Sequence, residues 1–225
     1  MGVFIAIEGG DGSGKATQTK ILAEYAEKIL KKNVFTIAFP QHGEFSSYYA
    51  DQYLNGAYGG VNDVHADLAS LPYAIDRFAA SPKIRAVLDD PNGLVIADRY
   101  VASNLAHQGS KLGDDKERHD YYDRMMQTEF EVLGIPKPDL NIILLVPSTI
   151  SQENIDKKET RAYTTMKRDI HEQDAGHLDR TKANYEELTE IYPEWFRAID
   201  CMNNTGTMRS IEDIQDDIRT LLTAV

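Results

Sequence analysis

Cysteine is almost absent from this chain. Its 225 residues include one cysteine, Cys201, which cannot form an intramolecular disulfide, and no group of thiols is available for a zinc site. This composition suits a reducing compartment, so we expect a cytoplasmic protein. Cys201 itself is expected to be a small buried residue near a C-terminal strand.

Positive charge is also scarce. The chain has 24 lysines and arginines against 36 aspartates and glutamates, which gives a net charge of −12. Because nucleic acids and anionic membranes attract basic surfaces, neither is an expected partner. If the ligand is a nucleotide, the positive groups that meet its phosphates must be concentrated at one site. No apolar run approaches the length of a membrane span.

Motifs of several enzyme classes are missing. The six histidines, at positions 42, 65, 107, 119, 171 and 177, show no zinc-ligand spacing, and His171-Glu172 lacks the second histidine of a metalloprotease helix. We find no nucleophile elbow and no Asn-Lys-x-Asp segment of the kind that guanine-specific GTPases carry. The chemistry must therefore be sought in other motifs.

The opening stretch predicts a phosphate-binding loop. A buried strand at residues 3–7 leads into the spacing G-x-x-x-x-G-K, from Gly9 to Lys15, and a helix follows. Glycines let successive backbone N–H groups surround phosphate oxygens, and the lysine reaches the β- and γ-phosphates. The alternative is a glycine-rich turn without a ligand. The predicted phosphate-binding residues, which the family resemblance given below assigns to ATP, are Gly9, Gly10, Asp11, Gly12, Ser13, Gly14, Lys15, Ala16 and Thr17.

Alternating strands and helices predict the fold class. Strands are expected at 34–39, 94–97, 140–146 and, at an edge, 196–201, and helices at 71–88, 115–133, 177–191 and from Ser210 onward. The first helix is expected from the spacing of its apolar residues Ile21, Leu22, Tyr25 and Ile29. This order indicates an α/β protein with a mainly parallel sheet, helices on both sides and ligands at the carboxyl ends of the strands. We expect one domain, residues 1–225, with a charged lid segment at about 150–174.

Three further side chains are candidates for nucleotide chemistry. Asp98 closes an apolar strand in the way of an acid that holds Mg²⁺ beside a phosphate loop. Arg99 is able to grip a phosphate through two parallel hydrogen bonds, although a surface ion pair is the alternative. Arg77 lies one helical turn from Tyr73, which suits a planar base, although Tyr73 and Phe78 fit a hydrophobic core equally well.

The chain resembles the thymidylate kinase family, whose members phosphorylate dTMP. Four segments carry the resemblance: IEGGDGSGK at 7–15, FPQHG at 39–43, AIDR at 74–77 and DRYVASN at 98–104. Only the first and last are specific by themselves, but all four occur in order and at the family's spacing. The resemblance implies a P-loop nucleoside monophosphate kinase-like fold with a five-stranded sheet, ATP as phosphoryl donor, Mg²⁺ and a homodimer. It also implies that the product, dTDP, enters dTTP synthesis.

The resemblance also implies roles for single residues. Lys15 would hold the ATP phosphates, Asp11 would touch the sugar or help place the acceptor phosphate, and Arg99 would bind that phosphate. A lid arginine would stabilise the transition state. The implied catalytic residues are Asp11, Lys15, Arg99, Arg161 and Arg168. The implied substrate-binding residues are Asp11, Phe39, Pro40, Tyr73, Arg77, Arg99, Asn104, His107 and His171. The implied metal-binding residues are Asp11, Asp98, Asp169 and Glu172.

Three positions depart from the family pattern. Ala16 replaces the usual serine or threonine that contacts Mg²⁺, and His42 and His107 stand where relatives often have an aromatic ring. Two alternatives therefore remain open beside a dTMP kinase. One is a nucleoside monophosphate kinase of other or broader base specificity, and the other is a nucleotide-binding regulator without catalysis.

Overall fold

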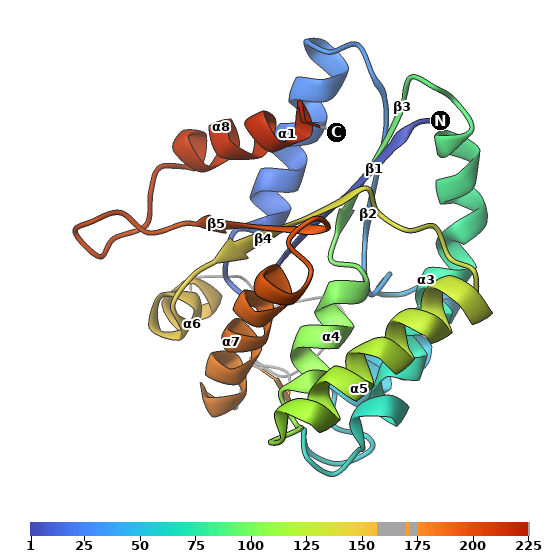
Figure 1. Cartoon of the computed structure of the whole chain (residues 1–225), viewed down its shortest axis with the longest axis vertical. Helices are drawn as coiled ribbons and strands as arrows, with labels where there is room; N and C mark the ends of the chain where they lie inside the picture. Colours follow the sequence, from blue (N-terminus) through green and yellow to red (C-terminus); the bar gives the residue numbers. More distant parts are fainter. Residues whose placement is uncertain (157–169, 172–174, 225) are drawn as a thin grey trace.

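The chain folds around a parallel sheet (Figure 1). The structure is a computed structural model that describes residues 1–156, 170–171 and 175–224. Within these residues the sheet has the strand order β2-β3-β1-β4-β5, and every pairing is parallel. This confirms the predicted sheet. The strands are β1 (Val3–Gly9), β2 (Asn33–Ala38), β3 (Gly93–Asp98), β4 (Leu140–Leu145) and β5 (Phe196–Asp200).

Strand β1 lies at the centre of the sheet and is buried on both faces. Phe4 and Ala6 belong to one hydrophobic core, and Ile5 and Ile7 belong to the other. Successive side chains of a strand point to opposite faces, so a strand covered on both sides is apolar at most of its positions. The segment that follows β1 therefore starts from a strand that is buried between two hydrophobic cores.

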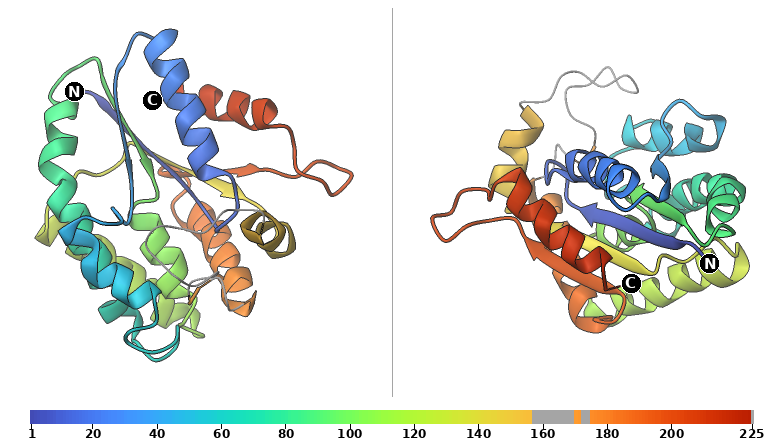
Figure 2. Two further views of the ribbon diagram at one scale, coloured as in Figure 1. Left: turned by 180° about the vertical axis from the view of Figure 1, so that it is seen from behind. Right: turned by 90° about the horizontal axis from the view of Figure 1, so that it is seen from above.

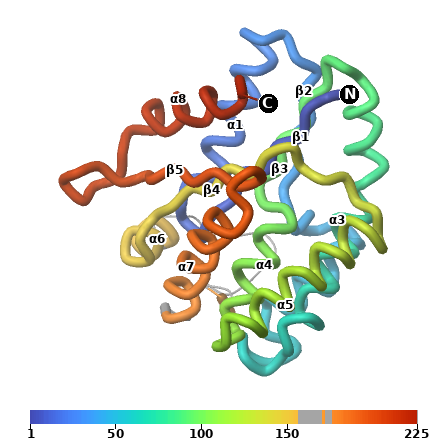
Figure 3. Tube along the Cα trace, viewed as in Figure 1, coloured from blue at the N-terminus to red at the C-terminus, as the bar shows by residue number. Residues whose placement is uncertain are grey.

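Helices cover both faces of the sheet (Figure 2). On one face α1 (Lys15–Lys28) packs beside α8 (Ile211–Leu222), so the last helix returns to the first, as the chain trace shows (Figure 3). The other face carries α3 (Ala66–Leu88), α4 (Val101–Gly109), α5 (Asp115–Met126) and α7 (Ala175–Ile191). The shorter elements are η1 (Phe45–Ser47), α2 (Tyr48–Leu54), the π-helical turn η2 (Gln127–Val132) and α6 (Ser148–Asp156).

Most predicted elements are present, but their limits differ. Helix α3 begins at Ala66, before the predicted start at Leu71, and the expected helix at 115–133 is α5 followed by the π-helical turn. Helix α4 was not predicted. Eight of its nine residues are buried, including Asn104 and His107, and nine residues are fewer than the window of about 11–18 over which helical periodicity is recognised.

Local details confirm one helix start and correct one helix end. Ser210 caps α8 by accepting a hydrogen bond from the backbone N–H of Asp213 at 3.1 Å, as the capping pair predicted. Ile29 was counted among the apolar residues of the first helix but lies just beyond α1. It is 66% exposed, whereas Leu22 and Ala26 are fully buried.

Cys201 is buried, as predicted. Burial raises the pKa of its thiol to about 12, so the side chain behaves as a small apolar group in the core beside β5. Among the described residues, none of the helices combines the length and apolarity needed to cross a bilayer.

A charged cluster ties α5 to α7. Glu187 accepts two hydrogen bonds from Arg118, at 2.8 and 2.7 Å, one from His119 at 2.9 Å and one from Tyr122 at 3.1 Å. The hydrogen bonds from Arg118, more than the opposing effect of burial, lower the pKa of Glu187 to about 2. The carboxylate therefore stabilises the packing of these two helices in its charged form.

Replacing Glu187 tests this contact. Glu187→Gln should lower the free energy of unfolding by about 1–2 kcal/mol at pH 7, because charged hydrogen bonds are lost. Since the folded-state pKa is depressed, the contribution is present above the unfolded value near 4.5 and is lost as the pH falls toward about 2. Urea unfolding of wild type and variant from pH 7 to pH 3 measures it. Glu190→Gln, an exposed residue of the same helix, is the control, and a pH-independent difference would contradict the assignment.

Candidate active site

A cavity of about 300 Å³ opens at the carboxyl ends of β1, β2 and β3. This is the edge at which the parallel sheet predicted a ligand. Tyr73, Arg77 and Asn104 all line it, so the three residues expected to meet the base converge on one pocket. The other predicted residues that line the cavity are Asp11, Gly12, Gly14, Lys15, Ala16, Thr17, Phe39, Pro40, Asp98, Arg99, His107 and His171.

The remaining candidates fall into two groups. Gly9, Gly10 and Ser13 belong to the same loop but do not line the cavity. Arg161, Arg168, Asp169 and Glu172 lie outside the described residues, as does most of the predicted lid segment.

The loop after β1 has the backbone of a phosphate site. Gly9, Gly12 and Gly14 all have positive φ angles, of 137°, 77° and 93°, a region that residues with a Cβ rarely adopt. Gly14 precedes α1, whose first turn receives no side-chain cap. The N–H groups of that turn and the positive end of the helix are therefore directed at the cavity, where they favour an anion.

Lys15 lies over this loop. Its side chain is buried, and its ammonium group donates a hydrogen bond to the Gly10 carbonyl at 2.7 Å. The position is the one from which a P-loop lysine reaches phosphate oxygens. Helix α6 packs against the loop from outside, because Asn154 donates to the Gly12 carbonyl at 3.0 Å and a Cβ at Gly12 would collide with the Ser151 carbonyl oxygen.

Arg99 points into the cavity from the turn after β3. Its backbone has a positive φ of 69°, which is strained for a residue with a side chain. The guanidinium donates to Asp11 Oδ1 at 2.5 Å, to the Gly9 carbonyl at 3.0 Å, to Ser103 at 3.1 Å and to His107 Nε2 at 3.3 Å. Its side chain is 15% exposed, so the ion pair that it forms with Asp11 lies in the wall of the cavity and not on the outer surface. Burial opposes the charge, but Asp11 offsets it and raises the pKa of Arg99.

Glu8 holds this turn in place, a role that the sequence did not reveal. The fully buried carboxylate accepts hydrogen bonds from the Tyr100 N–H at 2.7 Å, from Ser103 at 2.7 Å and from Tyr185 at 3.2 Å. Burial raises the pKa of Glu8. The available signal was a single acidic residue inside an otherwise apolar strand, since such a residue needs buried partners.

Asp76 performs a similar task on the opposite wall and was also missed. The fully buried carboxylate accepts from the Gln41 N–H at 2.7 Å, from the Gln41 side chain at 2.9 Å and from Ser46 at 2.5 Å. These bonds tie α3 to the segment after β2, where Phe39 and the cis residue Pro40 line the cavity. Tyr73 lines it from α3, but Phe78 is 52% exposed, so the core alternative is wrong for Phe78.

Arg77 is held by Glu129, from the π-helical turn, which the sequence did not single out. Glu129 accepts from Arg77 Nε at 2.6 Å and from its NH2 at 2.5 Å, and both side chains are almost fully buried. Burial opposes the charge of Arg77, but Glu129 offsets it and raises the pKa of the guanidinium. Glu129 also accepts from the Asn104 amide at 3.2 Å. One carboxylate thus orients both residues expected at the base edge.

The carboxylates in the cavity wall could supply part of the coordination shell of a magnesium ion. Asp98 and Asp11 line the cavity beside the loop, and carboxylate oxygens together with water and phosphate are the ligands that Mg²⁺ prefers. Ala16 offers no hydroxyl at the usual position. The side chains present therefore fit an ion held mainly through water and nucleotide phosphates.

Comparison with known proteins points to one family. A family profile described as "Thymidylate kinase" matches residues 7–218. A thymidylate kinase of Mycobacterium tuberculosis is 34% identical over 187 residues, covering 83% of this chain and 85% of the relative. A probable thymidylate kinase of Thermococcus gammatolerans is 30% identical over 221 residues, 97% of this chain and 94% of the relative.

Solved structures agree on the fold. A thymidylate kinase from Candida albicans superposes with a TM-score of 0.70 at 23% identity, covering 99% of this chain and 92% of that one. One from Ehrlichia chaffeensis gives a TM-score of 0.68 at 21% identity, with 98% of each chain covered. The nucleoside monophosphate kinase-like fold predicted from the sequence is thereby confirmed.

The loop lysine provides a direct test of the site. Lys15→Ala should weaken ATP binding about 10- to 100-fold, since a buried charged contact to phosphate is lost. Isothermal titration measures the affinity, and an unchanged thermal unfolding curve establishes that the fold is intact. Lys20→Ala, an exposed residue of the same helix, is the matched control. Near-normal ATP binding by the first variant would show that the loop does not hold phosphate.

Proposed function

The chain belongs to the thymidylate kinase family, and we propose that it carries out the family's reaction, the transfer of the γ-phosphoryl group of ATP to dTMP. The product, dTDP, is used in dTTP synthesis. One observation carries the proposal: the phosphate loop, Arg99 and the Arg77–Asn104 pair all face the same cavity. The residues that would bind the donor phosphates and those that would bind the acceptor base thus line one cavity.

Phosphoryl transfer depends mainly on alignment and on positive charge. The attacking oxygen, the phosphorus and the leaving oxygen must lie in line, and cations must stabilise the charge that develops. Lys15 and the N–H groups of the loop would hold the phosphates of ATP, and Arg99 would hold the phosphate of dTMP. Asp11 positions Arg99 through their ion pair. Arg161 or Arg168, in the predicted lid, would add a further cation.

Magnesium is the proposed metal. Asp98 and Asp11 would hold it through water on the cavity side, and Asp169 and Glu172 are the further candidates. When bound, Mg²⁺ neutralises part of the charge on the β- and γ-phosphates. The loop supplies no hydroxyl for it at Ala16, so the carboxylate of Asp98 would contribute more to its placement than the loop does.

The hydrogen-bond pattern around Asn104 supports the reading of thymine. Its Nδ2 group donates to Glu129 at 3.2 Å and to the Ser70 carbonyl at 3.1 Å. Both N–H bonds are thereby used, so the amide oxygen is the atom that would meet a ligand, and it accepts. The N3–H of thymine is a donor and fits this oxygen, whereas N3 of cytosine is an acceptor and does not.

Arg77 would complete the recognition of the base. Its NH1 group donates to the Tyr100 carbonyl at 3.3 Å, and a second hydrogen of the same group remains for thymine O4. Tyr73, half-buried at the cavity wall, would stack on the ring. We also propose that His107 and His171 contact the acceptor nucleotide, since both are buried in the same wall.

An apolar stripe on α3 supports a homodimer. Leu68, Leu71, Ile75 and Phe78 are 63%, 42%, 53% and 52% exposed and follow helical spacing, so they lie on one face. Exposed apolar surface of this kind favours association. We propose that two copies of the chain pack through this face.

The cellular setting is proposed from composition. A single buried cysteine, Cys201, suits the cytoplasm. We also propose that residues 1–225 form one kinase domain whose lid segment spans about 150–174.

A panel of acceptors tests the function. ADP release should be fastest with dTMP when ATP and Mg²⁺ are supplied with dTMP, dUMP, dCMP, AMP or UMP in turn. dCMP in particular should be a poor substrate, because the amide oxygen of Asn104 and N3 of cytosine are both hydrogen-bond acceptors. A coupled ADP-release assay gives kcat/KM for each. Equal activity with all five acceptors, or no activity with any of them, would contradict the proposed function.

Glu129 should affect the acceptor site alone. In Glu129→Gln the charged partner of Arg77 is lost, and we expect KM for dTMP to rise about tenfold or more while KM for ATP changes little. Steady-state kinetics with each substrate varied in turn measures this, alongside thermal unfolding of the variant. Glu131→Gln, two residues further along the same turn and exposed, is the control. A parallel rise in both KM values would contradict a specific role in positioning.

A further inference from the structure

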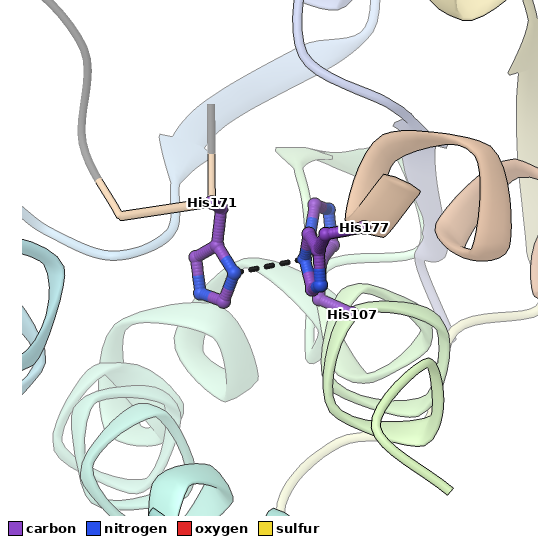
Figure 4. Close-up of side chains that lie close together, drawn as sticks. All are labelled: His107, His171 and His177. Carbon is purple, nitrogen blue, oxygen red and sulfur yellow. Dashed lines mark hydrogen bonds between the residues drawn. The ribbon is translucent and has the colours of Figure 1, made fainter. Parts of the chain in front are cut away.

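Three buried histidines from separate segments meet beside the cavity (Figure 4). His107 comes from α4, His177 from the first turn of α7, and His171 from the described residues between α6 and α7. They are 7%, 0% and 4% exposed, respectively. In the linear sequence they show no metal-ligand spacing, so only the fold brings them together.

The imidazole nitrogens converge at the separation that a metal ion requires. His177 Nε2 lies 3.4 Å from His107 Nδ1 and 2.8 Å from His171 Nδ1, and one nitrogen of each ring falls within a group no wider than 4.8 Å. Nitrogens bound to a tetrahedral Zn²⁺ at about 2.0–2.1 Å lie about 3.3 Å apart. Small movements of the rings would therefore bring all three to one ion.

The hydrogen bonds among these three rings cannot all form at the same time. Arg99 donates to His107 Nε2, so the neutral His107 ring carries its proton on Nδ1, facing His177. The Ser110 hydroxyl lies 2.8 Å from both the His107 carbonyl and His177 Nδ1, and its single proton can serve only one of them. In either tautomer His177 Nε2 offers one lone pair or one proton, whereas nitrogens of both His107 and His171 approach it. One lone pair cannot accept two well-aligned bonds.

We propose that His107, His171 and His177 bind one divalent transition-metal ion of the Zn²⁺ class, at a site separate from that of the catalytic Mg²⁺. Imidazole nitrogen suits Zn²⁺, Co²⁺ and Ni²⁺, whereas Mg²⁺ prefers oxygen. Three histidines leave the fourth tetrahedral position open to water or to a ligand in the cavity. The contact from His177 Nδ1 to Ser110 is the outer hydrogen bond that orients a ligating histidine.

The charged side chains around the cluster have opposing effects on cation binding. Burial first, and then Arg99, lower the pKa of His107, and burial and then His177 lower that of His171. Both rings are thus neutral, as ligation requires. Asp11 favours a cation at this place, whereas Arg99 and Lys15 oppose it. Affinity is therefore set by a balance that single substitutions can shift.

Arg99 is the residue most directly coupled to the ion. A metal on His107 Nδ1 places the ring proton on Nε2, where it would face an N–H of Arg99 at 3.3 Å. Metal binding and the Arg99–His107 hydrogen bond are therefore mutually exclusive. An ion at this site would release Arg99 from one of its four contacts in the cavity.

Cobalt provides the probe, because tetrahedral Co²⁺ absorbs visible light. Full-length protein without a histidine tag is titrated with Co²⁺ in excess Mg²⁺, followed by visible absorption and by isothermal titration. We expect one ion per chain and the spectrum of a tetrahedral nitrogen site. Weak multiple binding, displacement by Mg²⁺ or an octahedral spectrum would overturn the proposal. None of these readouts depends on kinase activity.

Substitutions locate the ion. His171→Gln and His177→Gln should each weaken Co²⁺ binding at least about 100-fold, because loss of a ligand costs more than loss of an outer contact. His65→Gln, an exposed histidine at the start of α3, should leave it unchanged. Thermal unfolding identifies any variant that fails to fold, and the other variant then decides. Unchanged binding in a folded variant would overturn the site.

A variant expected to gain affinity completes the test. Arg99→Met removes the opposing charge and lets His107 Nε2 keep its proton, so Co²⁺ should bind about tenfold more tightly. A structural cluster of neutral histidines, without a metal function, predicts no gain. Weaker binding or no change in Arg99→Met would therefore count against the proposed geometry.

Discussion

The buried carboxylate of Glu8 is the contact on which the arrangement of the site depends. It stands in the central strand, one residue before the phosphate loop, and accepts hydrogen bonds from Tyr100, Ser103 and Tyr185. These residues belong to the turn after β3, to α4 and to α7. Because a buried acid must find partners, Glu8 fixes the strained turn that carries Arg99. The phosphate loop and Arg99, which would meet the donor and the acceptor phosphates, are thereby both positioned from the end of β1.

Further paired charges extend this scheme across the cavity. Arg99 is paired with Asp11, and Arg77 with Glu129, so each guanidinium keeps its charge in a place where burial opposes it. Each pair also fixes the direction of the donors that remain. Preorganised donors of this kind suit phosphoryl transfer, since the protein contributes alignment and charge more than covalent chemistry.

The elements that the sequence predicted share a physical property: their signal is local. A continuous apolar strand, a glycine-rich loop before a helix and an acid at a strand end are each visible within a few residues, so the sheet, the phosphate loop and Asp98 with Arg99 were anticipated. Helix α4 was missed because its nine residues are fewer than the window over which helical periodicity is recognised. The roles of Arg161 and Arg168 stay predictions, since both lie outside the described residues.

The sequence by itself determined the fold class, the phosphate loop and the family, since these depend on short-range patterns and on motifs in a fixed order. Only the tertiary structure decided which charges pair. Glu129 reaches Arg77 across 52 positions of the chain, and Glu8 reaches Tyr185 across 177. It also decided that three histidines without any common spacing share one buried place. Such contacts are set by the packing of helices on a sheet, which no local pattern encodes.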